Sequence, residues 1–462
     1  MKVKFLAVAC AALGCASAFA ATYDPATTTA TQTVYIAGAS AQKNALLATV
    51  PTTIFDTATH GVLFINGANG AVAWLGDAKA AYGGGVTMVI YNSTNGSAAG
   101  LNQVISSGTP ETEAVVMASG NLTGCGAKTA VSAPNIAAEQ ISCTGPNAAR
   151  EADMALSDVY ADEFAPALLS SGTSLKAAST SASTGVEGFG VIVNSILYDA
   201  LLTKNIADGL LPSTCSTATA ASLVVGAGNG ACQPSVRSAD YSSLVTSGGQ
   251  FNSSNAFGVA AKNITLCRRD DLSGTQAASN MFFLNNVCGL EGFKGALAVV
   301  TDVGDTNAPS FNVVDAANVS TGKAEVCVWS GSATGTVANA DYGIGVVSTG
   351  EKDAVDAANT KPFYFVKLDG VSPNYTAAGV YDPLHRANLL NGSYKFATEM
   401  AAYVKSATSL TAGAGKVARA IADDIAKANL SNLTGIAYLA GTVDATKTAR
   451  YTKGGNNCSV WQ

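Results

Sequence analysis

Residues 269–275 read RDDLSGT and join an apolar, strand-like run at 264–266 to a helix-like run at 276–284. Ser273 suits the N-cap of that helix, and Gly274 lets the backbone come close to a ligand. The first turn of a helix has free N–H groups and the positive end of the helix dipole, which together attract anions. The stretch therefore predicts an anion-binding turn between a strand and a helix.

Arg269 gives this turn a permanent positive charge. Its planar guanidinium can hold two oxygens of one tetrahedral anion. Asp271, two residues later, is expected to hold the guanidinium in one orientation. The alternative is an ordinary surface turn with a capped helix and a local ion pair. These residues alone leave both interpretations open.

Two earlier stretches repeat the order of strand, small-residue turn, serine and helix. The strand-like run at 33–36 leads to GAS at 38–40, and the run at 86–91 leads to GSAAG at 96–100. A further strand pattern ends at Asp158, although a carboxylate in that position is more often a cap or a turn residue. Three such turns could enclose one anion between converging helix ends.

The N-terminus has the pattern of a secretory signal peptide, residues 1–20, with cleavage at about Ala20. Two lysines precede a short apolar run at 5–13, and Ala-Phe-Ala stands at 18–20. The run is too short to span a bilayer, and no later run reaches the roughly 20 apolar residues that spanning requires. We therefore expect a periplasmic or secreted protein without membrane insertion. The sequence leaves the choice between these locations, and the oligomeric state, open.

Cleavage would leave 24 basic and 32 acidic residues, a net charge of −8. An acidic surface argues against nucleic acid or an anionic membrane as the partner, since both attract basic patches. A small anion bound by local dipoles stays compatible with it. Because 48% of the residues are hydrophobic, the chain can form the cores of two lobes. We expect no cofactor, and the presence of two histidines in the whole chain argues against a zinc site.

Eight cysteines follow the predicted cleavage site, and an even number in an exported chain indicates disulfides. The expected pairs are Cys125 with Cys143 and Cys215 with Cys232, because each pair lies inside its own insertion. The sequence leaves open the pairing of Cys267, Cys288, Cys327 and Cys458. One pairing is excluded: the predicted helix would hold Cys267 and Cys288 about 20 Å apart, whereas a disulfide needs Cα atoms within about 7 Å.

Strand-like and helix-like runs alternate along the chain, which favours an α/β fold with mainly parallel sheets. An amphipathic helix is expected where Val417, Ile421 and Ile425 share one face. We also expect a strand at 324–329 and a helix at 394–404.

Taken in order, these stretches resemble the phosphate-binding protein family of the bacterial phosphate ABC importer, which has a type II periplasmic solute-binding fold. The likeness covers most of residues 32–405. The family has a Gly-Ala-Ser/Thr turn, a Gly-Ser-x-x-Gly turn, an Ala-Ser-Asp strand end and an Arg-x-Asp-x-Ser-Gly-Thr turn. Similar residues stand here at 38–40, 96–100, 156–158 and 269–275. The last motif is the most specific.

The resemblance implies that these turns enclose one inorganic phosphate or a similar tetrahedral oxyanion. The implied donors are the hydroxyls of Ser40, Ser97, Ser273 and Thr275 and the backbone N–H groups of Ala41 and Gly274. Arg269 would balance the charge, Asp271 would brace Arg269, and Asp158 would accept the proton of the anion. The family usually has an aromatic residue where Ala41 stands.

The same resemblance implies two lobes, residues 32–195 with 346–462 and residues 196–345, with crossings at 191–194 and 345–347. Two segments, 106–150 and 200–250, would be disulfide-bearing insertions. The implied role is capture of the anion for uptake, without catalysis. The implied partner is an inner-membrane ABC permease, and the sequence leaves open whether one exists.

Two other classes compete with this interpretation. A phosphate-processing hydrolase would need a nucleophile elbow or a metal cluster, and the sequence offers neither; His385 is expected at the surface or at a hinge. An exported envelope or adhesive protein on the same fold, with lost or altered ligand binding, is favoured by the insertions and the many small residues.

Overall fold

The fold is described by a computed structural model of the 462-residue chain. The described residues are 23–57, 61–67, 70–93, 95–104, 113–115, 122–131, 137, 139–145, 148–164, 168–169, 180–223, 229–246, 254–286, 288, 302–304, 311–314, 321–330, 341–351, 353, 362–405, 413–425, 433–437, 453 and 456–459. The predicted signal peptide lies outside them. Every structural statement below refers to the described residues.

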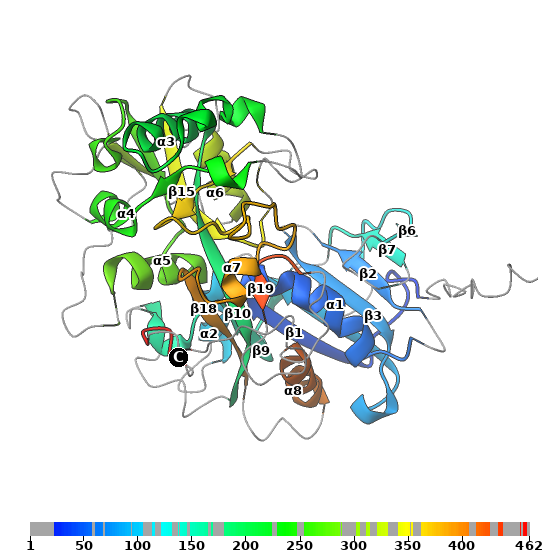
Figure 1. Ribbon diagram of the computed structural model, residues 1–462. Helices are drawn as coiled ribbons and strands as arrows, with labels where there is room; N and C mark the ends of the chain where they lie inside the picture. Colours follow the sequence, from blue (N-terminus) through cyan, green and yellow to red (C-terminus); the bar gives the residue numbers. More distant parts are fainter. Residues whose placement is uncertain are drawn as a thin grey trace, which may run out of the picture.

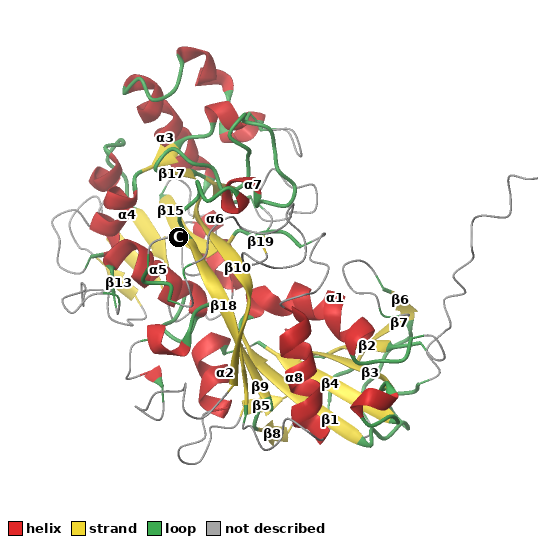
Figure 2. Cartoon of the chain, turned by 60° about the horizontal axis from the view of Figure 1, so that its bottom comes forward, coloured by secondary structure: helices red, strands yellow, loops and turns green. Residues whose placement is uncertain are grey.

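One long strand, β10 (Thr180–Val193), joins two α/β lobes (Figures 1 and 2). Its first part, as far as Gly188, pairs antiparallel with β18 (Ala397–Val404) of the first lobe. From Phe189 onward it pairs antiparallel with β15 (Tyr342–Ser348) of the second lobe. A sheet of 15 described strands therefore extends through both lobes, and the change from one lobe to the other begins just before the crossing predicted at 191–194.

In the first lobe the sheet is parallel at its centre, where β1 lies between β4 and β9. On one side, β18 lies next to β9 and is antiparallel to it. On the other side, the sheet continues from β4 through β3, β2, β7 and β6. Among these pairings only that of β2 with β7 is parallel. The strands are β1 (Gln32–Gly38), β2 (Leu63–Asn66), β3 (Val72–Asp77), β4 (Val86–Asn92), β6 (Thr129–Ala130), β7 (Glu139–Ser142) and β9 (Met154–Ser157). A separate pair is formed by β5 (Glu113–Val115) and β8 (Ala148–Arg150).

In the second lobe β12 lies between β14 and β15, and both pairings are parallel. The edge strand β13 is antiparallel to β14. The strands are β12 (Ile264–Cys267), β13 (Asp302–Gly304) and β14 (Phe311–Val314), with short strands β11 (Ser235–Val236), β16 (Tyr364–Phe365) and β17 (Lys367–Leu368). The short strand β19 (Ile436–Ala437) pairs with Val186 and Glu187 in the first-lobe part of β10. The α/β class is thus as predicted. The parallel ladders form the centre of each lobe, while the ladders around them and at β10 are largely antiparallel.

Helices cover both lobes, and α8 shows the predicted amphipathic face. Val417, Ile421 and Ile425 are fully buried in one apolar cluster with Leu46 and Val50 of α1. The helices are α1 (Lys43–Thr53), α2 (Gly96–Val104), α3 (Ser195–Ala207), α4 (Ser238–Val245), α5 (Gly274–Leu284), α6 (Thr321–Ser330), α7 (Ala387–Leu390) and α8 (Gly413–Ile425). The 3-10 turns are η1 (Ser40–Gln42), η3 (Ala80–Tyr82), η4 (Ala161–Glu163), η7 (Ser213–Thr217), η8 (Ala220–Ser222), η9 (Gly230–Cys232) and η10 (Ser254–Phe257). Among the described residues, no helix has the length and apolar character needed to cross a bilayer.

Two elements have a secondary structure that differs from the predicted one. The expected strand at 324–329 lies in helix α6, where Ala324, Cys327 and Val328 are buried at helical spacing. The expected helix at 394–404 is largely strand β18, which is buried along its whole length between β10 and β9. Burial on both faces removes the periodicity that distinguishes a strand from a helix in a sequence.

The lobe boundaries also need correction at 364–368, which the sequence assigns to the first lobe. β16 pairs with Ile192 and Val193 at the end of β10, and β17 pairs with β11. This segment therefore lies against the second lobe. The predicted insertions are also more closely joined to the lobes than expected, since β7 extends the first sheet beside β2 and the region 200–250 contains most of α3 and all of α4.

Four disulfides involve all eight cysteines of the predicted mature chain. Two are the expected pairs, Cys125 with Cys143 and Cys215 with Cys232. The other two join Cys267 to Cys327 and Cys288 to Cys458, so Cys267 and Cys288 are not bonded to each other.

Peptide mapping of the exported protein without reductant should recover these four linkages. The two short loops close 17 and 18 residues, and each should contribute roughly 3 kcal/mol to stability. A peptide that links Cys267 to Cys288 would contradict both the helix α5 and the pairing.

Candidate functional site

The carboxyl ends of β1, β4 and β9 meet at one edge of the first sheet, because these strands are parallel neighbours. At this edge the backbone segments approach closely. Gly38 ends β1 with φ of 114°, and a Cβ added there would lie 2.0 Å from the carbonyl oxygen of Leu156. A Cβ added to Gly100 of α2 would lie 2.6 Å from the Cα of Gly38. The glycines therefore let the first turns of α2 lie against the strand ends.

Ser97 and Asp158 are in contact at this edge. The backbone N–H of Asp158, directly after β9, donates to Ser97 Oγ at 3.4 Å. Thr398 Oγ1 of β18 donates to the carbonyl oxygen of Asp158 at 2.6 Å. Ser97 is fully buried and Asp158 is only 3% exposed, so the first lobe presents a buried hydroxyl and a buried carboxyl group side by side.

The second lobe brings the start of α5 to the same place. The backbone N–H of Ala98 in α2 donates to the carbonyl oxygen of Leu272 at 3.0 Å. A Cβ added to Gly274 would lie 2.5 Å from Ser97 Oγ and 2.7 Å from Asp158 Oδ2. Since any side chain at 274 would collide with these atoms, glycine permits the N-termini of two helices, one from each lobe, to meet.

The place where the N-termini of α2 and α5 meet is here called the junction. Arg269 and Asp158 are the charged residues at its centre. Arg269 is 4% exposed, and burial lowers the pKa of its guanidinium, an effect opposed first by Asp270 and then by Asp158. Burial raises the pKa of Asp158 to about 6, while Arg269 and a hydrogen bond with Ser97 act in the opposite direction. At neutral pH the buried carboxylate and guanidinium therefore balance each other.

The remaining predicted site residues differ in exposure. Ser273 takes the N-cap position of α5, yet its hydroxyl makes no capping hydrogen bond to the helix, and Ser273 and Thr275 are 2% and 4% exposed. Ser40, the first residue of η1, is exposed, and Ala41 is half-buried. The structure thus brings Ser97, Asp158 and Gly274 into contact beside Arg269, whereas Ser40 lies at the same strand edge with an exposed side chain.

Asp271 does not have the predicted partner. Its carboxylate pairs with the guanidinium of Arg268, not with Arg269. Consecutive residues of extended backbone point to opposite sides, and Arg268 lines a small cavity together with Tyr241 of α4 and Ser279 of α5. The acid with the largest effect on the pKa of Arg269 is Asp270.

Two buried polar residues near the junction were not predicted. Gln42 Nε2 donates to the carbonyl oxygen of Ser157 at 2.8 Å, and Gln42 Oε1 accepts from Thr184 Oγ1 at 2.9 Å, which joins η1, β9 and β10. Glu187 of β10 is fully buried, and its pKa is raised by burial and by Asp158. A charged residue inside the apolar strand VEGFGVIV at 186–193 is the signal that could have identified Glu187.

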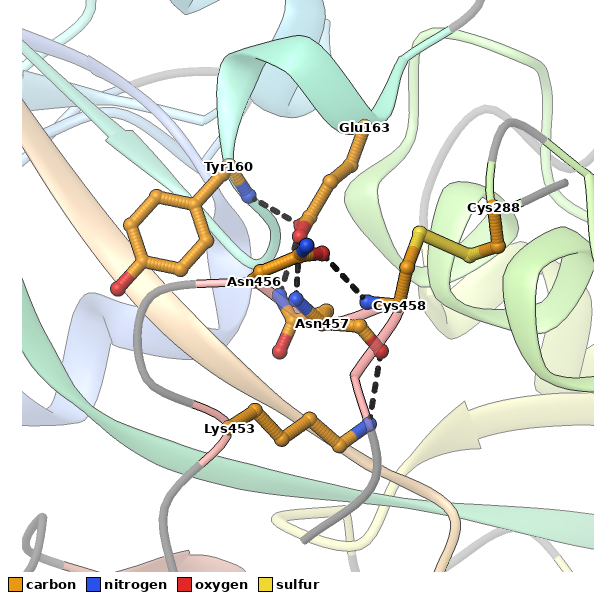
Figure 3. Close-up of a disulfide and its surroundings, with 7 residues drawn as sticks. All are labelled: Tyr160, Glu163, Cys288, Lys453, Asn456, Asn457 and Cys458. Carbon is orange, nitrogen blue, oxygen red and sulfur yellow. Dashed lines mark hydrogen bonds between the residues drawn. A yellow bond between two sulfur atoms is a disulfide. The ribbon is translucent and has the colours of Figure 1, made fainter. Parts of the chain in front are cut away.

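Residues 453 and 456–459, here called the C-terminal strap, are bound to the first lobe (Figure 3). Asn457 donates from its backbone N–H and from Nδ2 to the two carboxylate oxygens of Glu163 at 2.6 and 2.7 Å. Glu399 of β18 donates its backbone N–H to Asn457 Oδ1 at 2.6 Å and accepts from the backbone N–H of Lys453. Burial raises the pKa of Glu163 to about 7 and lowers that of Lys453 to about 8.

The strap is also bonded to the second lobe, because the disulfide between Cys288 and Cys458 joins it to the residues that follow α5 (Figure 3). Nearby, Phe282 of α5 stacks on Phe396, which precedes β18, with ring centroids 4.7 Å apart. A cavity of about 470 Å³ lies between α5, the start of β18 and the strap. The lobes are therefore in contact through an aromatic pair and a covalent bond as well as at the helix ends.

No protein-family model and no curated protein matches this sequence. Several solved structures are similar at 12% identity. One, from Clostridium perfringens, is named as a phosphate ABC transporter substrate-binding protein with bound phosphate; the match covers 85% of this chain and 96% of that one, with a TM-score of 0.39. Another is an ABC-type phosphate transport receptor from Vibrio cholerae, with coverages of 85% and 93% and a TM-score of 0.37. A possible phosphate binding protein from Planctomyces limnophilus has coverages of 55% and 64% and a TM-score of 0.27. At this identity the similarity concerns the fold alone.

Across the described residues, no group of three or more His, Cys, Asp and Glu side chains is placed to hold a metal ion. His385, expected at the surface or a hinge, is buried at 1% exposure. Its Nδ1 lies 2.8 Å from the carbonyl oxygen of Thr349, and its Nε2 lies 3.3 Å from the hydroxyl of Tyr381. These contacts give His385 a structural role beside the end of β15.

Proposed function

We propose that this chain is an exported solute-binding protein that captures inorganic phosphate, or a similar tetrahedral oxyanion, between its two lobes. The observation that carries the proposal is the meeting of the N-termini of α2 and α5, one from each lobe, beside the buried pair Asp158 and Arg269. Helix N-termini attract anions. Two of them at one buried place, with serine and threonine hydroxyls in their first turns, suit a small, highly charged oxyanion.

Export is supported by the cysteines. Four disulfides in one chain require an oxidising compartment such as the periplasm or the extracellular space. If the captured anion is taken up, an inner-membrane ABC permease would be the partner. The acidic composition argues against nucleic acid in that role.

Isothermal titration calorimetry of the exported chain with phosphate, arsenate, sulfate and nitrate tests the proposal. We expect saturable binding of one tetrahedral anion per chain, without turnover of phosphate esters. A folded chain that binds none of these anions would remove the proposed function.

Asp158 should make the site choose phosphate over sulfate. Near neutral pH phosphate carries a proton and sulfate does not. An ionised carboxylate can accept a hydrogen bond from the P–OH group of phosphate, whereas against sulfate it would face a bare oxygen of like charge. In a closed site this difference should reach roughly a thousandfold. In Asp158→Asn the amide can also donate, so the ratio of phosphate to sulfate affinity should fall, measured by calorimetry at pH 7.5, above the pKa of about 6.

Asp153→Asn is the matched control. Asp153 stands just before β9, at the other end from Asp158, and burial also raises its pKa. Its removal should leave the selectivity ratio unchanged. An equal ratio in wild type and Asp158→Asn would exclude Asp158 from the selectivity mechanism.

The second candidate is an exported envelope or adhesive protein that has lost the ligand. The disulfide between the strap and α5 favours it, because a covalent bond between lobes restrains the opening that a transport protein needs. Under this alternative the calorimetric panel gives no binding, while the melting transition stays cooperative.

A further inference from the structure

Glu187 is a fully buried carboxyl group close enough to Asp158 to affect its charge, and the proposed function does not yet use it. It lies on β10 opposite Thr398 of β18 and Ile436 of β19, where the strand leaves the first lobe, and it is fully buried. Among the described residues, neither of its carboxyl oxygens has a hydrogen bond of normal geometry, although the hydroxyl of Ser348 lies close enough to favour the ionised form of Glu187. Asp158 Oδ1 also has no hydrogen bond of normal geometry. Three buried oxygens without such a bond are costly in the absence of a ligand, because buried polar atoms are nearly always hydrogen-bonded.

The charges around Glu187 decide its protonation. Asp158 is the charged group with the largest effect on it, and Glu351, which follows β15, adds a further negative charge. Arg269 is the buried cation of the junction, and its charge is already offset by Asp270 and by Asp158. If Glu187 were also ionised, Arg269, Asp158 and Glu187 alone would carry a net charge of −1 before any anion arrived. The junction can accept an anion at low cost only when Glu187 is neutral.

We propose that Glu187, as a neutral carboxylic acid, is a further ligand-binding residue whose O–H donates a hydrogen bond to the captured oxyanion. This inference rests on the proposed function. In this arrangement Asp158 accepts the proton of the anion and Glu187 gives a hydrogen bond to one of its unprotonated oxygens. The two acids of the junction therefore have opposite hydrogen-bonding roles, set by their different protonation states.

Electrostatics agree with this geometry. Burial and then Asp158 raise the pKa of Glu187 well above its usual range, with Glu351 adding to the effect and the hydroxyl of Ser348 opposing it. A hydrogen bond from the neutral acid to the anion would raise that pKa further in the complex. Affinity should therefore be highest while Glu187 is protonated and should fall as the pH rises through its pKa in the free protein.

The experiment compares wild type, Glu187→Gln and Glu187→Leu by calorimetry with inorganic phosphate between pH 5.5 and 9. Glutamine is neutral at every pH and keeps a donor, so the affinity of Glu187→Gln relative to wild type should increase as the pH rises; the ratio cancels the titration of phosphate itself. Leucine has no donor, so at low pH Glu187→Leu should bind roughly ten- to a hundredfold more weakly than wild type, the effect of one lost hydrogen bond to a charged group.

Glu399→Gln is the matched control, since Glu399 is equally buried on the neighbouring strand β18. Its Oε1 accepts from the backbone N–H of Lys453 and its Oε2 accepts from the hydroxyl of Tyr160. In glutamine Oε1 can keep the first bond, and Nε2 can donate to the hydroxyl oxygen of Tyr160 in place of the second. Glu399→Gln should leave phosphate affinity unchanged relative to wild type at every pH.

The outcomes separate the two proposals. If wild type binds no anion at any pH, the proposed function fails and the role of Glu187 fails with it. If wild type binds phosphate and Glu187→Leu binds within twofold of wild type, only the role of Glu187 is overturned. Should Glu187→Leu not fold, the ratio for Glu187→Gln decides alone, and a ratio that stays constant across the pH range overturns the inference.

Discussion

Replacing Arg269 by alanine should abolish phosphate binding while the chain stays folded. The guanidinium is 4% exposed and is the buried cation next to Asp158. In the proposed complex Arg269 would form a buried, hydrogen-bonded charge pair with the anion, and truncating one member of such a pair typically costs about 2 to 5 kcal/mol of affinity. Loss of Arg269 also removes a charge that lowers the pKa of Asp158, so Asp158 should take up a proton more readily and lose its role as the acceptor. Calorimetry with phosphate and a thermal melt measure the two effects separately.

Arg268→Ala is the control that the chain itself supplies. Arg268 is as buried as its neighbour, but its guanidinium pairs with Asp271, and it lines the small cavity beside Tyr241. Its removal should lower the melting temperature and change phosphate affinity only slightly. If the two alanine variants lose affinity equally, the loss reflects general damage to α5; if Arg269→Ala keeps full affinity and a cooperative melt, the anion binds elsewhere.

The candidate site could be predicted where its signals are local. The turn at 269–275 places Ser273 at the N-cap and Gly274 in the first turn, and both positions follow from short-range rules about helix starts. The partner of Asp271 could not be predicted, since both arginines are within reach in the sequence and the choice depends on the direction in which each side chain leaves the backbone. The role of Glu187 could not be predicted for a similar reason, because its proximity to Asp158 results from the packing of β10 in the folded chain.

The fold could be predicted where periodicity is clear and not where burial is complete. α8 has one apolar face, and the spacing of Val417, Ile421 and Ile425 predicts it. β18 is buried from Ala397 to Val404 and rich in alanine, so its composition suggested a helix, and only its place between β10 and β9 makes it a strand. In α6 the valines and Trp329 suggested a strand, while the contact of Cys327 with Cys267 depends on a distant strand.

Removing the disulfide between Cys288 and Cys458, as the double variant Cys288→Ser/Cys458→Ser, should destabilise the chain and speed the exchange of anion. The two residues are 170 positions apart, and constraining so long a loop in the unfolded chain is worth up to about 5 kcal/mol in the entropy model. The bond also joins the strap, which is anchored to Glu163 and Glu399 of the first lobe, to the end of α5 in the second. Without it, non-covalent contacts would join the lobes here, among them those of Phe282 and Phe283 with Phe396.

Cys215→Ser/Cys232→Ser separates the two effects, because this disulfide closes only 17 residues within the second lobe. It should cost roughly 3 kcal/mol of stability and leave the release rate of bound phosphate unchanged. The Cys288 and Cys458 variant should release labelled phosphate faster, and small-angle scattering without anion should show a larger radius of gyration. Equal release rates and equal radii of gyration in the two double variants would mean that the strap stabilises the chain without restraining the lobes. The disulfide between Cys288 and Cys458 would then give no reason to prefer the envelope or adhesive protein over the transport protein.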